Sequence, residues 1–406
     1  MIKFRIRRNL KYPGQYLIWT VARDILNIIA TNFLGIQSSI SYCPFMFLGE
    51  FIAGGIIHLY LRKIDSQKSE SKDQYFMSIK LIKTEENDTD YFIPVDNKIK
   101  IIFLIFIASF LDWIIFFIDE GVIGKIKRLS FSISMRLYGF ATIFASFTYI
   151  YTLKLPLYKH HKLSLFVIGI CLIVIIVSEY FFQVRDITLS YIYFTYALLF
   201  IIASQLFVAI QDSIEKYLFE YNYLNPFVVL MYEGLFGFVL SFLFCFHHDY
   251  FRDIKNIFKN KKTGEIILFL FVLIVYMALS GLKNIFRVVT IKIFSPMASI
   301  LSYYIINPLY FPYYCIALKD FKDENDKINI PYLLLNIIIS IIISFFGCVY
   351  NEFIILFCCH LERDTHSQIS ERAITSLETE LVKVDDEENE GNNIYLNDFD
   401  SMANNN

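Results

Sequence analysis

The sequence lacks the motifs on which most soluble enzymes depend. It has no glycine-rich phosphate loop, no His-Glu-x-x-His zinc motif and no nucleophile elbow. Its seven cysteines are scattered, and their spacing fits neither a metal site nor a disulfide framework. Four of its seven histidines form two adjacent pairs in polar links, where solvated side chains are the simplest interpretation: His160-His161 and His247-His248. We therefore expect no enzyme, no cofactor, no metal ion and no nucleic-acid partner.

Long apolar runs dominate what is there. Of 406 residues, 56% are hydrophobic and 18% aromatic, and a soluble domain of this length would not carry so many unbroken apolar stretches. The charge is uneven along the chain. Residues 1–13 form a basic arm that we expect in the cytosol, whereas residues 360–406 are acidic and rich in Asn and Glu, and we expect this tail to be disordered. The composition predicts an all-α polytopic membrane protein.

Ten apolar segments are long enough to cross a bilayer. They are predicted at about 14–36, 42–62, 99–118, 129–152, 162–182, 190–214, 224–247, 264–286, 295–318 and 330–358. Five of them fall in residues 14–182 and five in residues 190–358. Because an odd number of helices per half places the halves in opposite orientations, we expect two inverted five-helix repeats. The count of Lys and Arg favours a cytosolic N-terminus.

A polar loop at residues 63–98 interrupts the first half. It is rich in charge of both signs and is expected to be mobile. The loop contains Asn87 in a glycosylation sequon, and a cytosolic loop would leave this sequon unused.

Two glutamates mark equivalent positions in the two halves. Glu50 and Glu233 each lie in the middle of an apolar span, and a glycine follows four residues later, at Gly54 and Gly237. A carboxylate in hydrocarbon costs roughly 2.5 to 3.5 kcal/mol on insertion scales, so it is retained only where it faces protein or water. One interpretation is gating, coupling or contact with cargo. The other is structural, with each carboxylate bonded to a neighbouring helix.

Other charged residues lie within or beside the spans. Lys283 and Arg287 share one helix face, where they either snorkel to the membrane edge or bind a phosphate or carboxylate. Arg23 and Asp24 are expected to form a structural pair. Further candidates for contact with cargo or coupling ions are Asp112, Arg136, Tyr303 and Asn307.

Four stretches together resemble the drug/metabolite transporter superfamily, in its solute-carrier-35 and nucleotide-sugar-transporter-like (EamA) branch. They run from Ile214 to Gly237, from Lys154 to Ser164, from Asn284 to Ser295 and from Gly347 to Leu356. The resemblance covers residues 14–358. It implies ten helices in inverted repeats, alternating access, both termini in the cytosol and a cargo site between the repeats. The chain departs from the family at Gly281-Leu-Lys-Asn284, where GDP-sugar carriers have a different signature, so sugar nucleotides are one cargo class among several.

The function expected from these features is secondary transport of a small polar organic solute, such as a nucleotide sugar or another metabolite. The alternative is a non-transporting membrane receptor or scaffold that acts through its acidic tail. The expected partners are a small-molecule cargo and the lipid bilayer, with a homodimer left open. A Golgi, endomembrane or vacuolar location fits the resemblance better than the plasma membrane.

Overall fold

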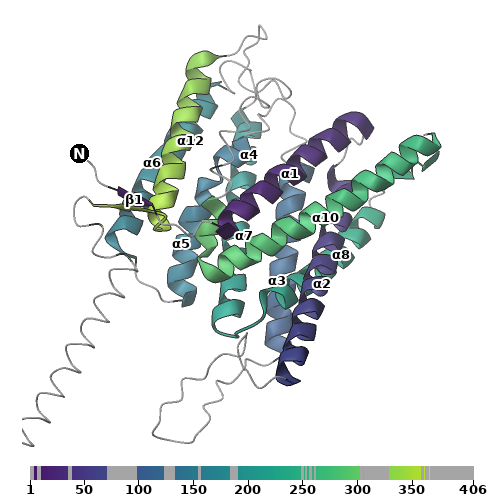
Figure 1. The fold of residues 1–406 in the computed structure, drawn as a ribbon. Coiled ribbons are helices and arrows are strands. Elements are labelled where there is room, and N and C mark those ends of the chain that lie inside the picture. Colours follow the sequence, from purple (N-terminus) through teal and green to yellow (C-terminus); the bar gives the residue numbers. More distant parts are fainter. Residues whose placement is uncertain are drawn as a thin grey trace, which may run out of the picture.

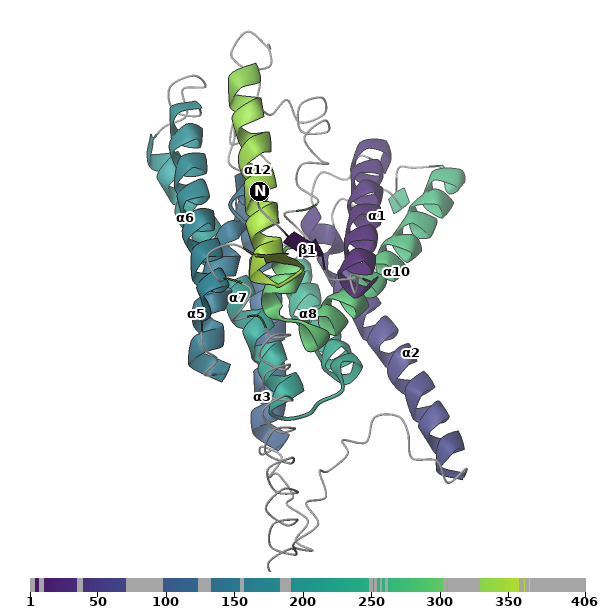
Figure 2. The same ribbon diagram turned by 60° about the vertical axis from the view of Figure 1, so that its left-hand side comes forward.

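The structure is a bundle of long helices with one short two-stranded ribbon (Figure 1). The computed structural model describes residues 4–6, 11–34, 39–70, 98–122, 133–153, 157–182, 191–247, 251, 254–255, 258–259, 262–301, 305, 329–357, 361 and 365. Figure 2 shows α5 and α6 on one side of the bundle, and α1, α2 and α10 on the other.

The described helices follow the predicted order. They are α1 (Lys11–Leu34), α2 (Cys43–Glu70), α3 (Lys98–Phe116), α4 (Ile133–Arg136), α5 (Gly139–Leu153), α6 (Lys159–Tyr180), α7 (Tyr191–Glu220), α8 (Pro226–His247), α10 (Thr263–Ile293) and α12 (Ile330–Tyr350). A 3₁₀ turn, η1 (Ser39–Tyr42), precedes α2, and a π-helical segment, η2 (Phe117–Val122), follows α3. Among the described residues, seven helices are long and apolar enough to cross a membrane: α2, α3, α6, α7, α8, α10 and α12.

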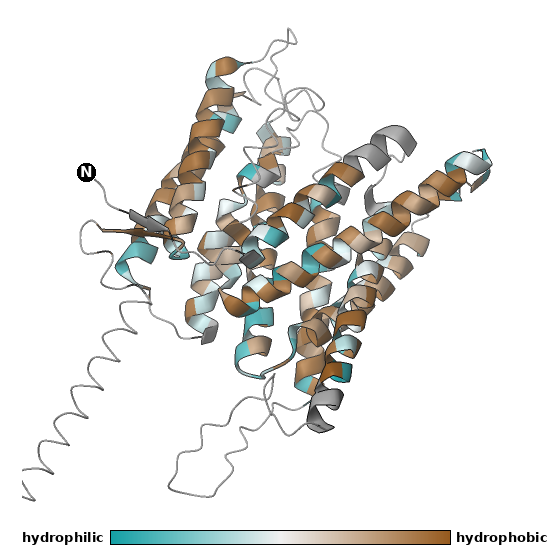
Figure 3. Ribbon diagram, in the orientation of Figure 1, coloured by the Kyte–Doolittle hydropathy of each residue, from teal (hydrophilic) through white to brown (hydrophobic). Residues whose placement is uncertain are grey.

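The outer surface of the helical bundle is apolar, and its interior contains charged side chains. Large hydrophobic side chains are exposed along the outside of the bundle, including Ile56, Phe103 and Phe166, while Glu50, Glu215 and Arg136 are at most 1% exposed. Figure 3 shows hydrophobic colouring along most of the helix lengths. Exposed apolar surface of this extent marks contact with lipid or protein. The pattern therefore agrees with a multi-pass membrane protein.

Several helices extend beyond the predicted spans. The polar loop predicted from residue 63 begins later, because α2 continues to Glu70. Helix α7 continues to Glu220 instead of ending near 214, and α10 continues to Ile293 instead of 286. Hydropathy underestimates α7 and α10 because polar side chains near their ends, among them Asp212, Glu215 and Arg287, are buried by other helices. As a result, Lys283 and Arg287 lie within a helix and are buried, not at a membrane edge where they could snorkel.

The fourth predicted span, 129–152, is not one continuous helix. Helix α4 ends at Arg136, a turn follows at Leu137 and Tyr138, and α5 begins at Gly139. Two tight backbone hydrogen bonds make this turn: the Phe140 amide donates to the Leu137 carbonyl at 3.1 Å, and the Ala141 amide to the Tyr138 carbonyl at 3.0 Å. With 15 residues, α5 is too short to cross the roughly 30 Å hydrocarbon core of a bilayer by itself.

The segment before the first helix and the segment after the last helix pair in a small antiparallel ribbon. Strand β1 (Phe4–Ile6) pairs with β2 (Ile354–Leu356), with Phe4 opposite Leu356. The tenth span was predicted to run to residue 358, but α12 ends at Tyr350 and the chain turns into β2. The predicted basic arm therefore includes a strand, which brings residues 4–6 and 354–356 to the same side of the bundle.

Helices α2 and α8 cross closely through their glycines. A Cβ atom on Gly54 would lie 2.8 Å from the Met231 amide nitrogen, and one on Gly234 would lie 2.8 Å from the Phe47 carbonyl oxygen. The two backbones are thus in direct contact, as small residues permit between membrane helices. As residue numbers rise along α2 they fall along α8, so these two helices run antiparallel.

The contacts of the neighbouring helix pairs show which helices run in the same direction and which pack together. Helices α2 and α10 run in the same direction, with Tyr42 beside Tyr276 at a ring-centroid distance of 5.5 Å and Ala53 beside Gly281. Helices α3 and α8 also run in the same direction, and their aromatic rings are in contact. Helix α1 packs on α10, α3 on α7, and α6 on α12.

Some predictions concern residues outside the part that the structure describes. They include Asn87, Tyr303, Asn307 and most of the acidic tail. The ninth predicted span is described only at residues 295–301, of which 296–301 are helical, and at residue 305.

We predict that the α2–α8 crossing tolerates no side chain at Gly234. In Gly234→Val the added atoms would meet the backbone of Phe47 and Phe51, so the helices must separate, and we expect a loss of about 1–3 kcal/mol of stability. Unfolding of the detergent-purified protein measures this loss. Gly169→Val on α6 is the matched control, because a Cβ there would meet nothing within 4 Å. Equal losses in both variants would contradict the prediction.

Candidate functional site

A cluster of charged side chains lies inside the bundle, where α2, α3, α7, α8 and α10 meet. We call it the central cluster. Its members are Glu50, Asp112, Gln211, Asp212, Glu215, Glu233, Lys283, Asn284, Arg287 and Ser299. Both halves of the chain contribute to it. Five of the eight residues that the sequence singled out are brought together here: Glu50, Asp112, Glu233, Lys283 and Arg287.

Arg287 on α10 is the most highly connected charge of the cluster. Its guanidinium lies 3.0 Å from Asp212 and 2.7 Å from Glu215, both on α7, and 3.7 Å from Glu233 on α8. It also donates to the Asn284 side chain at 3.2 Å. The sequence suggested that Arg287 binds an anionic group of the cargo. In the structure, carboxylates of the chain itself already surround this cation.

Glu50 is linked to α10 through Asn284. The Asn284 amide donates a hydrogen bond to the Glu50 carboxylate, and Glu50 is 1% exposed. Lys283 and Asp112 interact electrostatically with this carboxylate. Asp112 is partly buried, interacts with Arg287 and Lys283, and is hydrogen-bonded to Gln211. Asn284 thus connects the glutamate of the first half to the arginine of the second.

Glu233 is held less tightly than the other carboxylates. It is 3% exposed, its Oε1 atom has no hydrogen-bond partner among the described residues, and its ion pair with Arg287 is long, at 3.7 Å. Its backbone carbonyl accepts a hydrogen bond from the Ser109 hydroxyl of α3 at 2.7 Å. The helix is therefore anchored at this position while the carboxylate keeps capacity for a ligand.

The cluster contains more acids than bases. Five carboxylates (Glu50, Asp112, Asp212, Glu215 and Glu233) face two cations (Lys283 and Arg287), and Arg23, which also acts on Asp112, has its own partner in Asp24. In a medium of low dielectric constant, uncompensated charges of one sign are very costly. The imbalance can be relieved by protons, by an inorganic cation or by a positively charged group of a solute. This arrangement can therefore bind a cation or take up protons.

Arg136 lies in a separate buried group, which we call the peripheral cluster. Arg136 pairs with Glu179 at the end of α6 and donates to the Tyr332 hydroxyl at 2.9 Å and to Asn336 Oδ1 at 3.0 Å, both on α12. Tyr332 also donates to Glu179 and stacks on Phe182, with ring centroids 4.2 Å apart. The sequence placed Arg136 at a cargo site, whereas the structure gives it partners that connect α4, α6 and α12.

Arg23 and Asp24 contact each other as predicted. The Arg23 guanidinium donates to Asp24 Oδ1 at 2.7 Å, and both side chains are less than 20% exposed.

Sequence reasoning missed several charged residues of both clusters. The sixth predicted span, 190–214, contains Asp212 in its last turn and stops one residue before Glu215, where charge is common, although their i, i+3 spacing puts both on one helix face. Glu179 was overlooked because it ends an otherwise apolar span. In both cases the useful signal was a carboxylate within a turn of the predicted end of a span.

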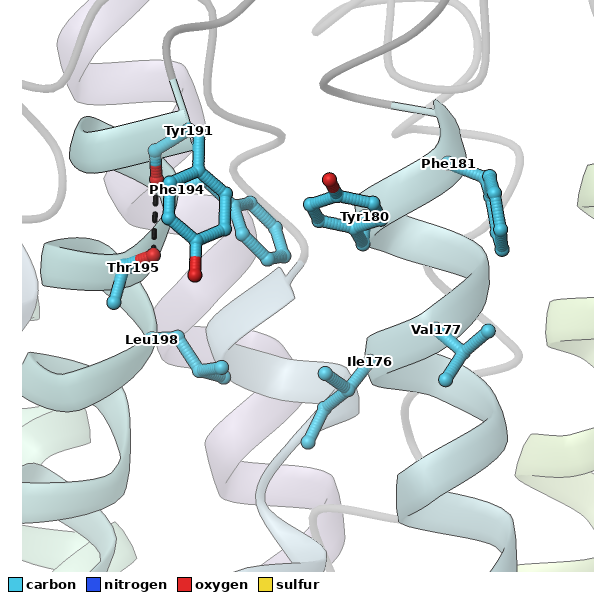
Figure 4. A pocket seen from close by; sticks show the side chains of 8 residues that line it. All are labelled: Ile176, Val177, Tyr180, Phe181, Tyr191, Phe194, Thr195 and Leu198. Atoms are coloured by element: carbon cyan, nitrogen blue, oxygen red, sulfur yellow. Dashed lines mark hydrogen bonds between the residues drawn. The ribbon is translucent and has the colours of Figure 1, made fainter.

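A hollow of about 390 Å³ lies between α6 and α7 (Figure 4), and no residue of the central cluster lines it. It is lined by Ile176, Val177, Tyr180, Phe181, Tyr191, Phe194, Thr195 and Leu198. Phe181 and Tyr191 are more than half exposed, so the hollow opens on the outer surface of the bundle. Its apolar lining does not suit a polar solute, and the charged cluster is the stronger functional candidate.

We predict that removing one partner of the Arg136–Glu179 ion pair destabilises the protein more than removing the charges of both. Arg136→Met alone leaves a fully buried carboxylate uncompensated and should cost about 3–5 kcal/mol. In Arg136→Met/Glu179→Gln much of this loss should be recovered. Arg23→Met, at the partly exposed pair, should cost less than Arg136→Met. Unfolding measurements on all three variants test this, and a double variant no more stable than Arg136→Met would contradict it.

Comparison with protein-family models found no match for this chain, and comparison with curated proteins found none either.

Proposed function

We propose that the chain is a secondary transporter that moves a small polar organic solute across a membrane by alternating access. The observation that carries the proposal is the central cluster. It is enclosed by apolar helices, it draws residues from both halves of the chain, and its charges are not balanced. Ionisable groups within a membrane bundle typically mark an ion or substrate path. Such a cluster has little use in a protein that serves only as a membrane anchor.

The proposed fold is ten transmembrane helices in two inverted repeats. Its support is the set of helix contacts, with α1, α2, α3 and α6 of the first half taken as equivalent to α7, α8, α10 and α12 of the second. Exchanging the halves turns the α1–α10 contact into α7–α3, and α2–α10 into α8–α3, while α2–α8 and α6–α12 are unchanged. All these contacts are present. The antiparallel run of α2 and α8 agrees with inversion of one half relative to the other.

The residue spacing adds support for this symmetry. Glu50 and Glu233 are 183 positions apart, and so are Phe51 and Gly234. Phe51 and Gly234 are in contact at the α2–α8 crossing. A contact between equivalent positions is expected on a two-fold axis. The proposed axis therefore passes one residue from both glutamates, as expected for a cargo site between the repeats.

The sign of the excess charge favours a cargo with a positive group. Because Arg287 is surrounded by three carboxylates, it offers less attraction to a phosphate than its position in the sequence suggested. A primary or quaternary amine could pair with Glu233 and Glu50. Protons would occupy the same carboxylates when the cargo leaves, which would couple its transport to a proton gradient.

We expect Glu233→Gln to abolish cargo binding without lowering stability. The change removes a charge whose Oε1 atom has no hydrogen-bond partner among the described residues and which lies near other acids, so folding should be unaffected or slightly improved. A thermal-shift screen of the purified protein against nucleotide sugars, nucleotides, amino acids and vitamins, with and without amino groups, would identify ligands. Uptake of a ligand so identified into proteoliposomes should fall at least about tenfold in the variant.

Two further variants separate transport from its alternative. Glu220→Gln, on the half-exposed pair with Lys216, is the matched control and should retain uptake. Deletion of residues 366–406 removes most of the acidic tail but keeps the buried Leu361 and Thr365, and a transporter should tolerate it. Loss of function on tail deletion, with Glu233→Gln still active, would refute the proposal and favour a receptor or scaffold.

A further inference from the structure

Three side chains with metal-binding atoms meet where α6 begins and α12 ends. His160 and His161 lie in the first turn of α6, and Glu352 follows α12 by two residues. One ligand atom from each residue can be chosen so that all three lie within 4.8 Å of one another. The group is near the β1–β2 ribbon and separate from the central and peripheral clusters. His160 is buried, and the other two residues are partly buried.

The spacing of these atoms suits ligands of one ion better than a simple ion pair. His160 Nε2 lies 3.5 Å from Glu352 Oε1, longer than the 2.7–2.9 Å of a charge-assisted hydrogen bond. Two ligands bound to zinc at about 2.0–2.1 Å in tetrahedral geometry are about 3.4 Å apart. The two imidazole centroids are 4.0 Å apart, although adjacent residues on a helix normally point in different directions.

The backbone of Glu352 provides an independent indication. Its φ is 56°, in the left-handed region that side chains other than those of Gly, Asn and Asp rarely adopt. The Glu352 amide donates to the Val349 carbonyl at 3.1 Å, and the Phe353 amide to the Cys348 carbonyl at 2.9 Å, so the turn is well held. Glycine is the residue expected at such a helix end. A glutamate that retains this costly conformation and lies against His160 points to a use for its carboxylate.

His161 has the supporting contacts of a metal ligand. Its ring is hydrogen-bonded to the backbone of Tyr350 and packs against the Tyr350 ring, with centroids 4.5 Å apart. A ligating histidine usually donates its second ring nitrogen to a carbonyl in this way. Its Nδ1 atom is 3.3 Å from the Tyr158 amide, a long contact that a metal ion could replace.

We propose that His160, His161 and Glu352 bind one divalent transition-metal ion of the zinc class. Two imidazoles and a carboxylate form a common zinc ligand set, and three protein ligands leave a fourth position for water. The ion would join the first turn of α6 to the end of α12, the last helix of each half. It would thereby restrain the relative movement of these two helices, a consequence that rests on the proposed transport function, whereas the binding itself does not.

Metal binding can be measured on the full-length chain in detergent after treatment with a chelator. We expect about one Zn²⁺ per chain by elemental analysis, a rise in the unfolding temperature on adding Zn²⁺, and a tetrahedral visible spectrum with Co²⁺. The variant His160→Ala/His161→Ala should lose the ion. In Glu352→Gln the affinity should fall at least about tenfold, because the charged ligand is lost.

Two controls distinguish the site from incidental binding and from unfolding. His247→Ala/His248→Ala removes the other adjacent histidine pair, whose first member His247 is the last residue of α8, and should keep the stoichiometry. Glu352→Gly removes the ligand but relieves the positive φ, so it should fold as well as the native chain and still lose the ion. Failure of the native chain to bind Zn²⁺, or unchanged binding in Glu352→Gly or in His160→Ala/His161→Ala, would overturn the proposal.

Discussion

The central cluster of this protein depends on the burial of one arginine. A guanidinium cannot lie inside an apolar bundle without carboxylates close by, because an uncompensated buried charge costs several kcal/mol. Arg287 meets this requirement with Asp212 and Glu215 from α7 and Glu233 from α8. Its position on α10 therefore determines how these three helices lie relative to one another. The carboxylates that gather around it exceed its charge, and this excess makes the cluster a candidate for binding a cation or protons.

Close helix contacts make the cluster compact. Gly54 and Gly234 let α2 and α8 approach until backbone touches backbone, and Gly281 does the same between α10 and α2. The lack of side chains at these points brings Glu50 and Glu233 near Arg287 and Asn284. Close packing and buried charge are thus linked, since wider helix spacing would separate the ion pairs and admit solvent or lipid.

The outer helices are joined by other means. Arg136 and Glu179 connect α4, α6 and α12 through Tyr332 and Asn336. At the opposite end of α6, His160 and His161 meet Glu352. The adjacent β1–β2 ribbon pairs the segment before α1 with the segment after α12. Helices α6 and α12 are therefore joined at both ends, while the central helices meet around charges that are not balanced. Under the proposed transport function, the central helices would be the ones that change state, within the frame that α6 and α12 form.

The sequence by itself determined the class of the protein and part of its site. Hydrophobic runs indicate membrane-length helices because the bilayer requires about 20 apolar residues per crossing, and seven of the predicted spans are such helices. Glu50 and Glu233 could be selected because charge is rare within apolar runs. The tertiary structure decided the partners: Arg287 is 75 positions from Asp212, and Glu179 is 153 from Tyr332. Hydropathy does not record which helix covers a polar last turn, so Asp212, Glu215 and Glu179 appeared to lie at membrane edges. Likewise, only the meeting of distant segments could reveal the β1–β2 ribbon and the group of His160, His161 and Glu352.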